Sequence, residues 1–261
     1  MNVAHDWRSL WLVLASLVGG ALNAMAGGGS FLSFPALLGI GVLPIQANAT
    51  NTVALWPGQL ASIAAYRQDL RANIRLLIPL LIAAALGGLA GGVVLLHTGQ
   101  TTFLRLVPWL LLVAALLFAV SSPISRWLRN RRVADPLTQP RPAMLPLFAG
   151  MLFVCFYIGY FGAGAGFLVM SLLALFGVQN INHINALKVC TTTVANGVAV
   201  LTFIVGRQIV WRYCLLMMIA AALGGYLGGR CSRRLNPTLM RTLVVVIGLC
   251  MAAYFFWRQQ R

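Results

Sequence analysis

The feature that most constrains this chain is a succession of ten apolar segments separated by short gaps. They occupy roughly residues 10–26, 30–43, 48–66, 74–96, 103–120, 144–161, 165–178, 185–206, 211–229 and 239–257. A helix of about 20 apolar residues crosses a bilayer core of about 30 Å. We therefore expect an all-α, polytopic integral membrane protein. Segments 30–43 and 165–178 are too short to span comfortably, so each either crosses or folds back against its neighbour.

The composition excludes the ordinary soluble classes. Charged residues make up 8% of the chain and hydrophobic residues 60%, whereas a soluble domain carries about 25% charged residues. The net charge of +16 does not indicate a nucleic-acid partner, because most basic residues lie in short gaps between apolar runs. Asp6, Asp69 and Asp135 all lie outside the apolar segments. The five cysteines form no CxxC pair, and we expect no metal site and no cofactor.

The two halves of the chain resemble each other. The run Ile82–Gly88 (IAAALGG) recurs letter for letter as Ile219–Gly225, an offset of 137 residues (82 to 219). At the same offset Asn48-Ala49 matches Asn185-Ala186. Each half holds five segments, and an odd number places the second half upside down relative to the first. If a short segment instead forms a hairpin with the segment before it and neither crosses, the half loses two crossings. Its number of crossings is still odd, so the second half is still inverted. The sequence therefore predicts two inverted repeats, which is a transporter architecture.

Residues 121–143 form the one long polar connection and contain four prolines and five arginines. We interpret 1–120 as the first transmembrane repeat, 121–143 as a basic cytoplasmic linker and 144–261 as the second repeat. With the linker in the cytoplasm, most of the 19 Lys and Arg residues lie on or near that side, as the positive-inside rule requires. The exceptions are Arg8, Arg105, Arg207, Arg212, Arg258 and Arg261. This orientation also places both termini outside.

Glycine runs precede both short segments and are the first candidate site. The first is Ala26–Ser30 (AGGGS), containing Gly27, Gly28, Gly29 and Ser30, and the second is Gly162–Gly166 (GAGAG), containing Gly162, Gly164 and Gly166. Successive glycines break a helix, and the N–H groups that open the next helix favour an anion. Two such breaks at matching positions indicate a transporter site. Close helix packing through small residues is the alternative, and we expect it for the Gly87-Gly88-x-x-Gly91-Gly92 pattern and its copy at 224–229.

Polar residues in or beside the apolar segments are the second candidate. Asn48–Thr52 (NATNT) corresponds to Asn185–Val189 (NALKV), so Thr50, Asn51, Asn185 and Lys188 fall in one matched pair of stretches. Asn51 and Lys188 occupy equivalent positions. Lys188 either holds a negative substrate or extends its ammonium group to the lipid headgroups. Asn23, beside the first glycine run, either lines the same cavity or bonds between helices.

These residues resemble the sulfite exporter TauE/SafE family. The first copy, AGGGSFLSFPALLGIGVLPIQANATN at 26–51, resembles the family's glycine run, Pro-containing apolar stretch and Ala-Thr pair, and 162–193 holds a degenerate second copy. The resemblance implies a multi-pass bacterial inner-membrane protein that carries sulfite, sulfonates or related sulfur anions. Some relatives carry an acidic residue before each glycine run, where this chain has Asn23 and Ile158.

The sequence thus predicts a transporter that exports a small anion by an electrogenic route without a membrane-embedded carboxylate. No Ser-His-Asp set or carboxylate pair is present in the sequence, so we expect no enzyme activity. The partners expected are the anionic substrate and membrane lipids, and a homo-oligomer is compatible with the sequence. The alternative is a non-transporting membrane subunit that anchors a partner protein, which would lack a cavity between the glycine breaks. A cation carrier is the third reading, and the absence of acids from the apolar segments disfavours it.

Overall fold

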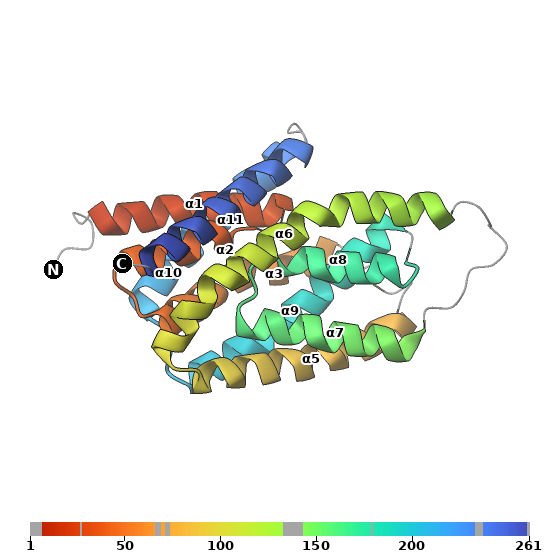
Figure 1. The fold of residues 1–261 in the computed structure, drawn as a ribbon, viewed down its shortest axis with the longest axis horizontal. Helices are drawn as coiled ribbons and strands as arrows, with labels where there is room; N and C mark the ends of the chain where they lie inside the picture. The colour runs from red at the N-terminus through yellow and green to blue at the C-terminus, as the bar shows by residue number, and fades with distance from the viewer. Residues whose placement is uncertain are drawn as a thin grey trace.

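The fold is taken from a computed structural model, which describes residues 7–26, 28–65, 69–70, 74–132, 143–178, 180–232 and 237–259. This part of the chain contains ten helices, one for each apolar segment (Figure 1). They are α1 (Trp7–Ala26), α2 (Ser30–Gly39), α3 (Pro44–Ala65), α5 (Ile74–His97), α6 (Gln100–Arg132), α7 (Met144–Tyr160), α8 (Ala165–Leu175), α9 (Ile181–Val205), α10 (Trp211–Ser232) and α11 (Pro237–Gln259). The expectation of an all-α membrane fold is confirmed.

Part of the stretch interpreted as a linker is helical. Helix α6 continues to Arg132, so residues 121–132 are helical although we expected a linker from 121 onwards. The four Arg residues at 126, 129, 131 and 132 have high helix propensity, and they outweigh the single proline. The rest of that segment, apart from Ala143, lies outside the described residues, and the division of the chain there stays a prediction.

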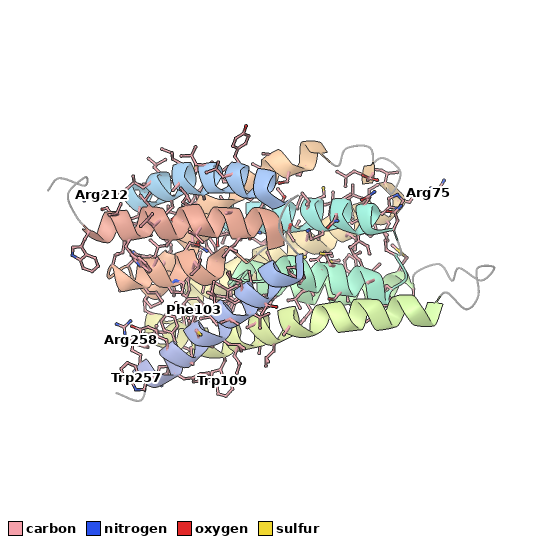
Figure 2. All side chains as sticks on the ribbon, turned by 90° about the horizontal axis from the view of Figure 1, so that it is seen from above. Arg75, Phe103, Trp109, Arg212, Trp257 and Arg258 are labelled. Carbon is pink, nitrogen blue, oxygen red and sulfur yellow. The ribbon has the colours of Figure 1, made fainter. Side chains whose placement is uncertain are left out.

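Four helical stretches in the described part of the chain are long and apolar enough to cross a membrane. They are Ile74–His97, Asn182–Val205, Trp211–Gly228 and Thr242–Gln259. Their outward residues are apolar: Ile82 and Leu223 are about half exposed, which suits contact with lipid tails. Arg258 and Trp257 lie together at one end of the molecule (Figure 2), as expected where aromatic and basic groups meet the headgroups.

The two short helices fold back as hairpins. In the first hairpin, α1 and α2 pack antiparallel: a methyl group at Gly19 would lie 3.0 Å from the carbonyl oxygen of Gly29 and 3.6 Å from Ser33. In the second, a methyl group at Gly150 near the start of α7 would lie 3.0 Å from Leu172 near the end of α8. The question left open by the short segments is therefore answered: both helices return toward the end from which the preceding helix came.

The halves make the same contacts twice. Helix α1 packs along α10 and α7 packs along α5, while α3 lies against α10 and α9 against α5. Both short helices also end alike: the N–H of Val42 donates to Leu37 O at 3.1 Å, and that of Val178 donates to Leu173 O at 3.1 Å. Gly41 and Gly177 stand before these donors with φ of +92° and +100°, a backbone that favours glycine.

The second half is inverted. In Figure 1, α1 begins at the left end of the molecule and α7 at the right end. Arg75 and Arg212 are equivalent at the offset of 137 (75 to 212), and Figure 2 places them at opposite ends. The end of α6 and the start of α7, which flank residues 133–142, both lie at the Arg75 end (Figure 1). Below, the two ends are called the Arg75 end and the Arg212 end.

Glycines allow the closest helix contacts. A methyl group at Gly224 of α10 would collide with the carbonyl oxygen of Leu17 of α1, and one at Gly87 of α5 would lie 2.6 Å from Leu152 O of α7. Gly228 and Gly91 make the same type of contact one turn later. The expected packing role of the double glycines is thus confirmed at these four positions, and small residues bring the helix backbones together as in other membrane bundles.

We expect Gly224→Ala to lower the stability by about 1–3 kcal/mol, the usual cost of overpacking. The added methyl group has no room against Leu17, and its helix must shift. The change can be followed as thermal unfolding in detergent through the fluorescence of the seven tryptophans. Gly39→Ala is the matched control, because nothing lies within 4 Å of a methyl group there. Equal midpoints for the two variants would contradict the packing assignment.

Candidate substrate site

A cavity of about 570 Å³ lies between the two halves. Helices α3, α9 and α10 form most of its wall, and the starts of α2 and α8 reach it from either hairpin. The polar side chains that line it are Asn23, Ser30, Thr52, Gln59, Ser62, Lys188, Thr192, Asn196 and Tyr226. Phe161, Phe167 and Met218 add an apolar wall. The lining residues come from the middle and second half of α3, the first half and middle of α9 and the middle of α10, so the cavity begins at mid-helix and extends toward the Arg75 end.

Lys188 carries the one formal charge among the described residues that line the cavity. Its Nζ donates to Asn185 Oδ1 at 3.3 Å, one turn earlier on α9. Its stem passes the start of α8, where a methyl group at Gly166 would lie 3.5 Å from Lys188 Cδ. The ammonium group therefore has a neutral partner on its own helix, and the aliphatic stem that carries it lies beside the N-terminus of α8.

The break before α8 is a glycine-dependent turn. Gly162 and Gly164 have φ of +76° and +71°, which L side chains rarely adopt. The turn is held by Tyr157, whose hydroxyl donates to Ala163 O at 2.8 Å, and by Asn48, whose Nδ2 donates to Tyr160 O at 3.1 Å. Helix α8 thus begins inside protein, where its first N–H groups and dipole favour a negative group.

The first half fills the equivalent place with neutral groups. Asn51, the counterpart of Lys188, donates from Nδ2 to Ser30 Oγ at 3.0 Å. Its Oδ1 lies 2.5 Å from Ser33 Oγ, and Ser33 also donates to Gly29 O at 3.0 Å. Asn51 and Ser33 are buried. The start of α2 is therefore closed by a side-chain network, whereas the start of α8 faces a cation.

The structure sorts the sequence-predicted site residues into three groups. Those that line the cavity are Asn23, Ser30, Gly162, Gly166 and Lys188. Asn51 and Asn185 hold lining side chains in place through the hydrogen bonds above. The others make packing or backbone contacts: Thr50 Oγ1 accepts from Val210 N at 3.0 Å, Gly28 packs against Val244, Gly29 against Gly19, and Gly164 against Phe31. Gly27 lies outside the described residues.

Several lining residues were missed because they stand inside long apolar runs. Gln59 and Asn196 are the clearest example, with Asn196 Nδ2 donating to Gln59 Oε1 at 3.1 Å. They are equivalent at the offset of 137 (59 to 196), and an amide at the same place in both repeats is the signal that would have found them. Gly225 was expected to pack, but it lines the cavity.

The described residues contain no group of three or more His, Cys, Asp or Glu side chains that could hold a metal ion. His183 Nε2 lies 3.9 Å from Asp69 Oδ1, which makes an ion pair when the histidine is protonated, and both side chains are about one-third exposed. Neither residue is among those that line the cavity. The chemistry available in the cavity is therefore binding by one cation, amides, hydroxyls and the start of α8.

Two inverted halves with broken helices around an internal polar cavity define a membrane transporter. The family profile described as "Sulfite exporter TauE/SafE" matches residues 12–255. The chain belongs to this family, as the motif resemblance indicated.

Curated relatives support the same class. A "Probable membrane transporter protein" of Haemophilus influenzae is 27% identical over 263 residues, covering 99% of this chain and 98% of the relative. The "Probable membrane transporter protein YfcA" of Escherichia coli K12 is 29% identical over 248 residues, covering 93% and 87%. "Probable membrane transporter protein ORF9" of a Sinorhizobium species is 25% identical over 246 residues, covering 93% and 90%. No solved structure matches the chain.

We expect Asn51→Ala to lower the stability by about 1–3 kcal/mol, because it removes the buried amide that bonds to both Ser33 and Ser30. Asn185→Ala is a comparison on α9, since it removes one 3.3 Å bond to a half-buried lysine. Thermal unfolding in detergent should place the Asn51 variant clearly below the Asn185 variant. The reverse order would show that the Asn51 network does not hold the start of α2.

Proposed function

We propose that the cavity binds a small anion, namely sulfite, a sulfonate or a related sulfur-containing anion, and that the protein exports it across the bacterial inner membrane. The observation that carries this proposal is Lys188: a cation in a cavity, beside the positive end of α8, with the neutral Asn185 as its hydrogen-bond partner. Two positive features that face the same space at membrane depth favour a negative ligand. No carboxylate is among the described lining residues to compete with it.

The rest of the lining suits an oxyanion. Asn23 and Ser30 supply hydrogen-bond donors, because the Ser30 oxygen accepts from Asn51 and leaves its O–H group free to donate. The aromatic rings of Phe161 and Phe167 and the Met218 side chain give an apolar wall that would accept the organic part of a sulfonate. Cavities of about 300–1,000 Å³ are usual for small molecules, so the volume accommodates sulfite and larger sulfonates. The family description supports sulfur anions, while the names of the relatives state only that they are transporters.

The membrane potential favours the export of an anion. The cell interior is negative, so one negative charge leaving the cell gains about 2.3 kcal/mol per 100 mV. A membrane-embedded carboxylate, the usual proton carrier, is missing from the sequence of the apolar segments. Export without a coupled ion is therefore the direction that these residues support. The positive-inside orientation would place the Arg75 end, and with it the cavity, toward the cytoplasm.

We expect Lys188→Gln to reduce anion transport at least tenfold, because the charge that offsets anion desolvation is lost. Lys188→Arg should keep much of the transport, since it retains a cation. Radiolabelled sulfite or a sulfonate loaded into proteoliposomes provides the measurement. Arg75→Gln removes a charge from an exposed position at the end of the molecule and should transport normally. Unchanged flux in Lys188→Gln would remove Lys188 from the binding site.

We also expect the flux of a monovalent anion to follow the membrane potential. In proteoliposomes with a potassium diffusion potential, 100 mV should shift the equilibrium distribution by about fifty-fold, the equivalent of about 2.3 kcal/mol. The same potential should leave uptake of a neutral analogue unchanged. Flux that ignores voltage but needs a pH gradient would show proton coupling and would overturn the electrogenic route.

A further inference from the structure

The inference drawn here rests on the proposed transport of an anion and concerns the residues that meet it throughout the cycle. Gln59 and Asn196 are equivalent in the two repeats and hydrogen-bond to each other at 3.1 Å. A second cross-repeat bond joins Trp56 Nε1 to Thr193 O at 2.9 Å, again over 137 residues. A pseudo-two-fold axis relates the two inverted halves, and equivalent residues that contact each other must lie close to it. The crossing of α3 and α9 therefore contains this axis, and the cavity reaches it.

The two sides of this crossing differ. On one side α5 is closed against α9: a methyl group at Gly88 would collide with the carbonyl oxygen of Ala195, and Ala195 is fully buried. On the other side the equivalent glycine of α10 is Gly225 (88 to 225), and its nearest atom would be Gly20 O at 3.7 Å. Gly58, the counterpart of Ala195 on α3, has nothing within 4 Å. The cavity therefore lies between α3 and α10, and the equivalent space between α9 and α5 is closed.

A buried hydroxyl points to a second state. Thr191 of α9 is 0% exposed, and its Oγ1 has no hydrogen-bond partner among the described residues. A buried polar group without a partner is uncommon and calls for an explanation. Its counterpart at the offset of 137, Ala54 (54 to 191), lines the open cavity. If α5 moved away from α9 as α10 stands away from α3, the Thr191 hydroxyl would line an equivalent cavity and reach water.

We propose that Gln59 and Asn196 contact the transported anion in both access states, and that transport exchanges the opening between α3 and α10 for an equivalent one between α9 and α5. Residues on the axis keep their place when the halves exchange roles, so they face the substrate from either end. Ser62 and its counterpart Ala199 (62 to 199) each face it in one state. The amides of Gln59 and Asn196 offer N–H donors to an oxyanion and exchange their mutual bond for bonds to it.

Labelling by a membrane-impermeant thiol reagent tests the two states. Single cysteines are placed at Ser62, Asn196 and Ala199 in a chain whose five natural cysteines are replaced and whose transport is retained. In vesicles of both orientations, we expect Ser62→Cys to react only from the Arg75 end and Ala199→Cys only from the Arg212 end. Asn196→Cys should react from both. Asn196→Cys reacting from one end only, or Ala199→Cys never reacting, would overturn the proposal.

Gly225→Ala tests the closure of α10 on α3. The methyl group fits the present state, but in the closed state it would meet the backbone of Gly58 as Gly88 meets Ala195. We expect normal folding, normal labelling of Ser62→Cys, loss of Ala199→Cys labelling and at least a tenfold loss of transport. Gly99→Ala is the matched control, because its nearest atom would also lie at 3.7 Å, on Thr102. Equal transport by the two variants would contradict the proposed closure.

Substitution of the amides tests their contact with the anion. Asn196→Ala should raise the KM for sulfite or a sulfonate about tenfold or more, the usual effect of losing a hydrogen bond to a charged group, with little change in thermal stability. The exchange Gln59→Asn with Asn196→Gln keeps one amide on each helix and should restore KM. An unchanged KM in Asn196→Ala would overturn the contact. If Asn196→Cys is labelled from both ends but no tested sulfur anion is transported, the proposed substrate is wrong, whereas the exchange between two access states is supported.

Discussion

The acyl tails of lipids cannot hydrogen-bond to a peptide group, and this constraint determines how the protein is built around its two helix breaks. Irregular backbone at membrane depth persists only where protein or a water-filled cavity surrounds it. Each break here has that shelter: the turn before α8 is bonded by Tyr157 and Asn48, and the start of α2 by Ser33 and Asn51. The hairpins consequently meet inside the bundle, and polar side chains line a cavity between the two halves.

The sequence allowed the ten helices, the duplication and the inversion to be predicted. The length of an apolar segment and the offset between repeats are both signals that extend over many residues. The fold-back of the short helices followed from contacts that length alone does not fix. The same limit applied to the site. Lys188 and Ser30 were candidates because a charge near the start of an apolar segment and a hydroxyl beside a glycine run are visible in the sequence, whereas Gln59 and Asn196 stand inside long apolar runs. Thr50 was a candidate too, and in the structure its hydroxyl accepts from the backbone N–H of Val210.

The double glycines show how one pattern serves two purposes. Gly224 and Gly87 have no room for a side chain because they fix α10 to α1 and α5 to α7. Adjacent to them, Gly88 is closed against α9 while Gly225 borders the cavity. A helix that presents glycine on two neighbouring faces can hold one partner tightly and approach another closely. The α1–α10 and α5–α7 pairs therefore behave as compact units on either side of the α3–α9 crossing.

The divergence between the repeats then decides what the cavity can hold. In a symmetric duplication, both helix starts would carry the same side chain, but one half has Asn51 and the other Lys188. Asn51 is neutral and bonds to Ser30, so the start of α2 adds no second cation to the cavity. Neutral closure of α2 leaves a single charge on α9, on a helix that belongs to the central crossing. In the proposed cycle, an anion held beside Lys188 would remain near this crossing while the helices around it rearrange.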